Sequence, residues 1–274
     1  ITIIDKPNQA QAGNDTTLCV TANITLNGNQ PNTGNNGNWT LLSGPNVPTI
    51  LQPNNHQTSV TNLIAGQYRF IWTISNGICS DTKDTVTINI IAPPAAPNAG
   101  LDTIVCLQNS FQLYATYTNG TIGYWRWLDG PARPNFNDSL LHNATISNLV
   151  AGQYRFSWNL TNNICPLLSD TLTITFTPPA SLANAGNDTV LCLTNTYQLH
   201  AQPMVTGEGK WRLLSGPSTI VFSNTNDPAA TISNITAGTY QLEWMSSNGV
   251  CAPSRDTVQI QFTALPSIAN AGID

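Results

Sequence analysis

Apolar residues at every second position mark one stretch of the chain that occurs three times. The first copy reads AGQYRFIW over residues 65–72, and Tyr68, Phe70 and Trp72 share one parity. The copies over 151–158 and 237–244 repeat the pattern. A period of two is typical of a strand with one buried face, so each copy is predicted to be the central strand of a module.

Two further signals show that the repeat spans the whole chain. Pairs of Trp recur 33 residues apart in each copy, and the motif Ala-Gly-x-Asp returns every 86 or 87 residues, at Ala12, Ala99, Ala185 and Ala271. Modules of this size match small β-sandwich domains of roughly 100 residues. We therefore predict an all-β chain of three tandem immunoglobulin-like sandwiches. The expected repeats are 11–97, 98–183 and 184–269, with 1–10 ending a preceding repeat or linker and 270–274 starting a following one.

Nine aromatic residues of the repeat are predicted to form the cores of the modules. Their parity and constant spacing favour burial over a role as platforms for stacking carbohydrate. The Gly-x-Tyr step before each central strand also resembles the tyrosine corner of immunoglobulin-like sandwiches. The predicted core residues are Trp39, Tyr68, Trp72, Trp125, Tyr154, Trp158, Trp211, Tyr240 and Trp244.

The six cysteines fall as two per module, 59 or 60 residues apart. Six cysteines permit many pairings, and the repeat favours pairing within each module, with one disulfide in each. Disulfides indicate an oxidising, extracellular compartment. The alternative is that the thiols are reduced and buried. The expected pairs are Cys19 with Cys79, Cys106 with Cys165, and Cys192 with Cys251.

Composition narrows the classes of function. Charged residues make up 8% of the chain, far below the usual value of about 25%. The net charge of -5 is spread without a basic patch, which argues against nucleic acid as a partner. No apolar run reaches the length of about 18 residues that a membrane span needs. With two Glu and three scattered His in no recognisable motif, we expect no enzymatic activity.

Asp-Thr pairs recur in every module and raise the question of a metal. Calcium held at the module junctions by oxygen ligands would stiffen the array, and the candidate ligands are Asp15, Asp102 and Asp188. The alternative is that these carboxylates accept backbone N–H bonds in turns and at strand ends. No other cofactor is expected.

Features that break the repeat are the candidates for surface contact. The sequence Tyr-Trp-Arg-Trp over 124–127 belongs only to the second module, and Tyr124 and Arg126 share the outward parity. These two residues are the predicted contact site. Neutral drift between copies is the alternative.

The motifs together resemble those of a known family. Asn-Ala-Gly-x-Asp-Thr over 98–103 and 184–189 precedes a cysteine, and Gly-x-Tyr-x-x-x-Trp leads into Asn-Gly-x-Cys at 76–79 and 248–251. This combination is similar to the PKD-type, immunoglobulin-like repeats of giant cell-surface adhesins of Bacteroidota, including gliding-motility adhesins of the SprB type. The second module departs from the pattern with Asn163 in place of Gly, and the first with Gln11 in place of Asn.

The resemblance implies a repeat segment of a large secreted adhesin on the bacterial cell surface, exported by type IX secretion and serving attachment or gliding motility. Stiff modules in series would form a semi-rigid stalk. The expected partners are an extracellular polysaccharide or solid surface and the neighbouring repeats of the same chain. Two alternatives remain: a passive spacer, or a carbohydrate-binding accessory array on a secreted polysaccharide-degrading enzyme.

Overall fold

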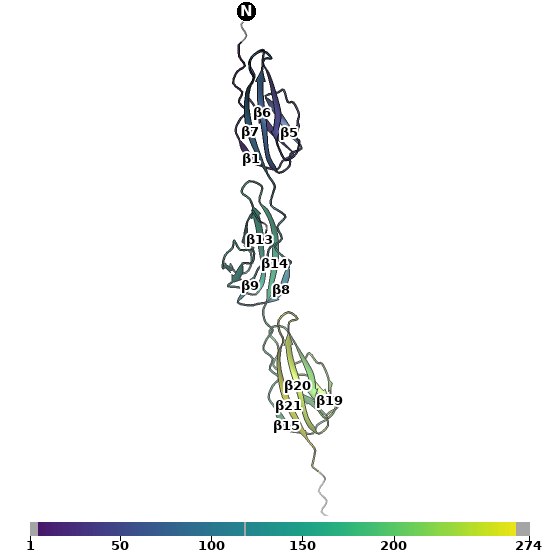
Figure 1. Cartoon of the computed structure of the whole chain (residues 1–274). Helices are drawn as coiled ribbons and strands as arrows, with labels where there is room; N and C mark the ends of the chain where they lie inside the picture. The colour runs from purple at the N-terminus through teal and green to yellow at the C-terminus, as the bar shows by residue number, and fades with distance from the viewer. Residues whose placement is uncertain (1–4, 118, 267–274) are drawn as a thin grey trace, which may run out of the picture.

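The structure, a computed structural model, describes residues 5–117 and 119–266 and shows three modules following one another end to end (Figure 1). Every regular element in these ranges is a β-strand, which confirms the predicted all-β class. No helix long and apolar enough to span a membrane occurs in them. The segments expected to belong to neighbouring repeats fall partly (1–10) or wholly (270–274) outside the described residues.

Each module is a sandwich of a four-stranded and a three-stranded sheet. In the first module the larger sheet has the order β1-β7-β6-β3 and the smaller has the order β2-β5-β4. The strands are β1 (Thr16–Cys19), β2 (Asn23–Asn27), β3 (Asn36–Ser43), β4 (Thr49–Ile50), β5 (Gln57–Thr61), β6 (Gly66–Ser75) and β7 (Thr82–Ile91).

The second and third modules repeat this arrangement. Their larger sheets have the orders β10-β13-β14-β8 and β15-β21-β20-β17, and their smaller sheets β11-β12-β9 and β16-β19-β18. The second module contains β8 (Thr103–Cys106), β9 (Ser110–Gln112), β10 (Ile122–Asp129), β11 (Asn135–Phe136), β12 (Thr145–Ser147), β13 (Gly152–Thr161) and β14 (Leu168–Thr177). The third contains β15 (Thr189–Cys192), β16 (Thr196–Gln198), β17 (Glu208–Ser215), β18 (Val221–Phe222), β19 (Thr231–Ser233), β20 (Gly238–Ser247) and β21 (Ser254–Thr263).

The predicted central strand is β6 and its equivalents β13 and β20. It lies between β3 and β7, antiparallel to both. The first strand, β1, instead runs parallel to β7, with Thr16 opposite Ile88 and Cys19 opposite Ile91. This parallel pairing carries Cys19 to the end of β7 that faces the next module.

The structure buries all nine predicted core aromatics, each with at most 3% of its surface exposed. The two Trp residues of a module face each other across the central strand pair, with ring centroids 5.0 Å apart for Trp39 and Trp72. The equivalent pairs lie 5.2 and 5.0 Å apart. Large aromatic rings bury about 150–250 Å² each and so dominate the energetics of a small core.

The tyrosine corner is confirmed in every module. The hydroxyl of Tyr68 accepts a hydrogen bond from the backbone N–H of Ile64, four residues upstream, at 2.9 Å. The equivalent bonds, from Val150 to Tyr154 and from Thr236 to Tyr240, measure 3.0 and 2.9 Å. Gly66 lies two residues before the tyrosine and has a φ of +141°. A Cβ there would lie 2.8 Å from Pro45. Only glycine therefore allows the turn that contains Pro45 to close onto this corner.

Candidate functional site

The disulfides join neighbouring modules and do not close each module on itself. Cys19 is bonded to Cys165 and Cys106 to Cys251, with Cα atoms 4.8 Å apart in both pairs. Cys79 and Cys192 are free thiols. The prediction of one disulfide within each module, pairing Cys19 with Cys79, Cys106 with Cys165 and Cys192 with Cys251, is therefore wrong in all three pairs.

The geometry of β7 explains the correction. Cys19 lies opposite Ile91, the last residue of β7, whereas Cys79 lies in the loop just before Thr82, its first residue. A strand of 10 residues at about 3.3 Å per residue holds its ends about 30 Å apart. Bridged cysteines have Cα atoms only about 4.4–6.8 Å apart. The two cysteines of one module therefore cannot reach each other.

Sequence spacing could not distinguish the two patterns. The second cysteine follows the first by 59 or 60 residues within a module and by 145 or 146 residues across a junction, and both intervals repeat regularly. The deciding observation is the parallel pairing of β1 with β7. The available signal was the short apolar-rich stretch directly before each first cysteine, had it been recognised as a strand that ends beside the last strand of its module.

An asparagine holds each cysteine loop and the linker together. The side-chain carbonyl of Asn162 accepts hydrogen bonds from the N–H groups of Ile164 at 3.2 Å and Cys165 at 2.8 Å. Its amide group donates to the carbonyl of Ala92, the first residue after β7, at 2.9 Å. At the second junction the same three bonds of Asn248, to Val250, Cys251 and Pro178, measure 3.1, 2.8 and 2.7 Å.

The residue after this asparagine has a left-handed backbone in all three modules. Gly77 has a φ of +72°, Gly249 one of +76° and Asn163 one of +63°. Asn is the non-glycine residue that most readily adopts this conformation. The departure of the second module from the Asn-Gly-x-Cys motif therefore leaves the loop unchanged.

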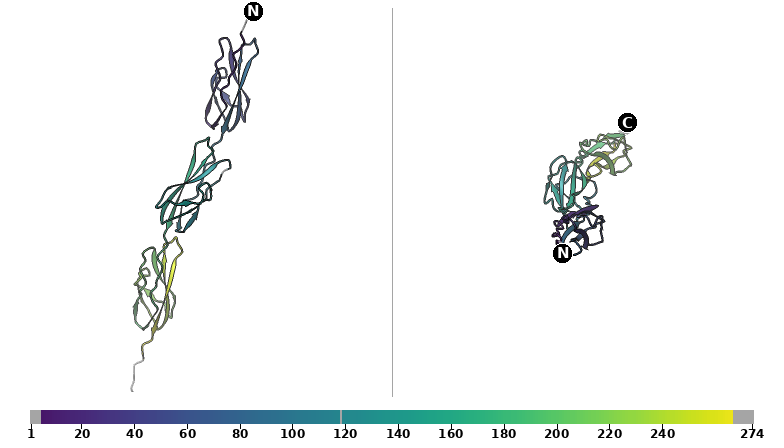
Figure 2. Two further views of the ribbon diagram at one scale, coloured as in Figure 1. Left: turned by 90° about the vertical axis from the view of Figure 1, so that its left-hand side faces the viewer. Right: turned by 90° about the horizontal axis from the view of Figure 1, so that it is seen from above.

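Each junction thus has two covalent connections, the linker and the disulfide, and a hydrogen bond from the asparagine side chain to the linker. The linker after β7 carries Pro93, Pro94 and Pro97, which restrict its backbone. The disulfide ties the end of β1 to the cysteine loop of the next module close to that linker. Two perpendicular side views show the modules in one extended row (Figure 2). The disulfide and the linker together join the two modules at two points, which limits how far one module can turn about the linker.

The candidate calcium ligands lie along the edge of the sheet, away from the junctions. Asp15 accepts the N–H of Thr87, in the middle of β7, at 2.8 Å, and Asp84 accepts the N–H of Ala12 at 2.7 Å. Asp102 and Asp170, and Asp188 and Asp256, repeat both bonds in the other modules. Within residues 5–117 and 119–266, no three metal-binding side chains gather. These carboxylates act as backbone acceptors, which is the alternative that the sequence left open.

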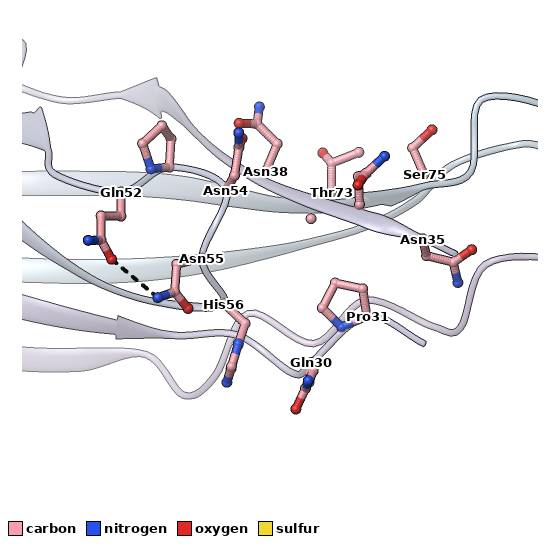
Figure 3. A pocket seen from close by; sticks show the side chains of 13 residues that line it. Gln30, Pro31, Asn35, Asn38, Gln52, Asn54, Asn55, His56, Thr73 and Ser75 are labelled. Atoms are coloured by element: carbon pink, nitrogen blue, oxygen red, sulfur yellow. Dashed lines mark hydrogen bonds between the residues drawn. The ribbon is translucent and has the colours of Figure 1, made fainter. Parts of the chain in front are cut away.

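A polar groove of about 930 Å³ lies on one face of the first module (Figure 3). Its walls come from β3, β6 and the two connections over 30–35 and 52–56. Sequence reasoning did not single out this groove, although the density of Asn and Gln in the two connections was an available signal. Its amide side chains are those of Gln30, Asn35, Asn36, Asn38, Gln52, Asn54 and Asn55.

The same face has different chemistry in the other modules. Asn38, Tyr124 and Lys210 occupy equivalent positions in the three modules. Across the central strand pair they lie opposite Thr73, Asn159 and Met245 respectively. In the third module a hollow of about 640 Å³ lies here.

The predicted contact residues of the second module belong to this face. Tyr124 is half-buried and Arg126 is exposed on β10. The side-chain amide of Asn159 donates to the carbonyl of Tyr124 at 3.2 Å, which fixes the backbone beneath the ring. The structure thus brings Tyr124 to the position of the amide groove, with Arg126 two residues further along the strand.

Comparison with known proteins finds a family match for the first module. Residues 12–90 match the family model of the K319L-like PKD domain. The first module therefore matches a PKD-type model, and the other two modules repeat its arrangement of strands. The mouse dyslexia-associated protein KIAA0319-like protein is 24% identical over 221 residues, which cover 74% of this chain and 21% of that protein. The chain thus spans about a fifth of the length of this curated relative.

One solved array of immunoglobulin domains shares the fold of the chain. The N-terminal eight immunoglobulin domains of Down syndrome cell adhesion molecule match 95% of this chain and 36% of that one, with a TM-score of 0.58 and 10% identity. The solution structure of a PKD domain from the KIAA 1837 protein matches 36% of this chain and all of that domain, with a TM-score of 0.29 and 22% identity.

Proposed function

We propose that this chain is a repeat segment of an extracellular cell-surface adhesion protein, in which the modules form a semi-rigid stalk. The observation that carries the proposal is the closure of both junctions by a disulfide. A stalk that holds a binding site away from a surface must keep its modules in line, and these junctions restrict bending. The PKD-type repeats and the fold shared with an array from a cell adhesion molecule support this role.

The junction disulfides allow a direct test of the stalk. Replacing all four bonded cysteines by serine should leave the modules folded, because each has its own core, but should shorten the maximum dimension measured by small-angle X-ray scattering. The matched control is Cys79→Ser/Cys192→Ser, which removes only the free thiols and should leave that dimension unchanged. An unchanged dimension in the fourfold variant, with circular dichroism showing folded modules, would contradict the proposal.

The finer proposal concerns the parent protein. The repeat motifs support a large secreted adhesin of Bacteroidota, exported by type IX secretion, with a non-enzymatic role in attachment or gliding motility. Antibodies raised against this chain should label intact cells of the source organism, and deletion of the segment should weaken attachment or gliding. Labelling only after the cells are broken open would contradict a surface location.

The modules themselves are proposed to touch a polysaccharide or solid surface through the face that contains the groove. Amide groups donate and accept hydrogen bonds, and this suits the hydroxyl groups of sugars. Tyr124 adds an aromatic ring. Because the equivalent residues are Asn38, Tyr124 and Lys210, each module would contribute a different contact.

Binding measurements separate the adhesive role from a passive spacer. The chain is applied to a panel of insoluble polysaccharides and to hydrophilic and hydrophobic beads, beside the Asn38→Ala/Asn54→Ala and Tyr124→Ala/Arg126→Ala variants. Gln261→Ala, on the exposed face of β21, is the control. Retention that the double variants lose and the control keeps supports adhesion through this face. A folded chain that no surface retains would favour the passive spacer.

The alternative of an accessory array on a secreted polysaccharide-degrading enzyme differs in what the stalk carries. Release of soluble sugars by the native parent protein, from a polysaccharide that retains this chain, would favour it over the adhesin.

A further inference from the structure

We infer that Cys79 and Cys192 are each positioned to form a disulfide with a cysteine of a further module of the same kind. Each bond would cross a junction like the two that the structure contains, beside a linker of the same type. The inference stands apart from what the stalk binds, because it concerns how the modules are connected. It rests on features that Cys79 and Cys192 share with the four bonded cysteines.

The loop of Cys79 already has the conformation of a closed junction. The side-chain carbonyl of Asn76 accepts hydrogen bonds from the N–H groups of Ile78 at 3.1 Å and Cys79 at 2.9 Å. Its amide group donates to the carbonyl of Asp5 at 2.9 Å. These are the three bonds that Asn162 and Asn248 make. Asp5 therefore takes the place that Ala92 and Pro178 have at the two closed junctions.

The strand that ends at Cys192 is equally complete. β15 pairs in parallel with β21, with Cys192 opposite Thr263, and the N–H of Leu193 donates to the carbonyl of Thr263 at 2.9 Å. At the closed junctions the bonds from Val20 to Ile91 and from Leu107 to Thr177 measure 2.9 and 2.8 Å. Cys192 thus presents its thiol, which is exposed, on the same backbone that holds Cys19 and Cys106.

The surroundings favour a cysteine of another module over other partners. Cys79 and Cys192 belong to the first and third modules of an extended row, so they cannot bond to each other within one chain (Figure 1). No cluster of three metal-binding side chains occurs near either within the described part of the chain. The closed junctions supply the matching geometry twice. A module of the same kind is therefore the partner that fits.

The bond forms by thiol–disulfide exchange with a low-molecular-weight disulfide such as oxidised glutathione. One cysteine thiolate attacks that disulfide and releases one glutathione thiol, and the second cysteine then displaces the other. Two cysteine thiols are oxidised to one disulfide, and the small disulfide is reduced to two thiols, so electrons and protons balance.

A tandem chain provides the test. Residues 1–263 are followed directly by residues 5–274, so that Asp5 follows Thr263 as Ala92 follows Ile91 in the native linker. Cys192 of the first copy and Cys79 of the second are then 146 residues apart, the separation of Cys19 and Cys165. Cys79→Ser in the first copy and Cys192→Ser in the second remove the outer thiols. The tandem is refolded with reduced and oxidised glutathione.

We expect a monomer without alkylatable thiols and a digest in which Cys192 is linked to Cys79. Adding Cys192→Ser to the first copy should leave one alkylatable thiol, at Cys79. Two alkylatable thiols, glutathione adducts or intermolecular dimers would overturn the inference, provided that the Cys19–Cys165 and Cys106–Cys251 peptides show that both copies have folded.

Discussion

Cys19, at the end of β1, is bonded to Cys165, in the loop between β13 and β14 of the next module, 146 residues further along the chain. The bond connects the two modules beside the linker that already joins them. A second bond, from Cys106 to Cys251, repeats this relationship, so each of the two junctions has a disulfide in addition to the backbone linker. Their first effect is on how modules are held relative to one another.

Disulfide mapping should reproduce this connectivity. Under native, non-reducing conditions, alkylation should label Cys79 and Cys192, with Cys192 reacting faster because it is exposed and Cys79 is half-buried. Mass spectrometry of the digest should then find Cys19 linked to Cys165 and Cys106 linked to Cys251. Peptides that link Cys19 to Cys79 would contradict the structure and restore pairing within modules.

The disulfides should also limit how far the chain extends under force. With both bonds intact, the shortest covalent path runs from residue 1 to Cys19, across to Cys165, back to Cys106, across to Cys251 and on to residue 274, about 100 residues. At about 3.3–3.6 Å per residue, the unfolded chain reaches about 350 Å. The reduced chain, with all its residues in the path, reaches about 900 Å or more.

Single-molecule force spectroscopy on the chain held at its two ends measures this difference directly. Adding a reductant during stretching should release the additional length. The Cys79→Ser/Cys192→Ser variant should behave as the native chain does. Equal lengths with and without reductant would mean that the junction disulfides do not form.

A glycine variant tests the packing of the tyrosine corner. Gly66→Ala places a Cβ 2.8 Å from Pro45 on a backbone with a φ of +141°, which L side chains rarely adopt. We expect the free energy of unfolding of the first module to fall by about 2 kcal/mol or more. The control is Gly77→Asn, at a φ of +72° with open space around the site, because Asn163 has this conformation in the second module. Chemical denaturation should show a large loss for the first variant and a small change for the second.

A carboxylate variant tests the assignment of the Asp residues as backbone acceptors. Asp84→Ala leaves the N–H of Ala12, a buried residue, without its acceptor at 2.7 Å. We expect a loss of about 1–3 kcal/mol in the stability of the first module. Asp81→Ala, at an exposed position nearby, should have little effect. If calcium addition raised the stability of the native chain, and Asp84→Ala or Asp15→Ala removed that gain, a metal role would replace this assignment.

The sequence by itself determined the all-β class, the threefold repeat, the central strands and the aromatic core. These are local properties: Tyr68, Phe70 and Trp72 alternate with polar residues because a strand places successive side chains on opposite faces. The tyrosine corner was predictable for the same reason, since the bond from Ile64 to Tyr68 spans four residues. The outward parity of Arg126 likewise follows from the alternation, and the structure leaves it exposed.

Only the tertiary structure decided which cysteines meet and which polar residues share a groove. Cys19 reaches the junction because β1 pairs in parallel with β7, which lies about 70 residues further along. Asn38 and Asn54 meet in one groove because the connection before β5 folds beside β3. Such placements depend on contacts between distant segments and between modules. The regular spacing of the cysteines is compatible with pairing within a module and with pairing across a junction. The physical reason is that the alternation of apolar and polar residues shows which face of a strand is buried. Which strands pair, and which cysteines meet at a junction, depends on how the strands assemble into sheets.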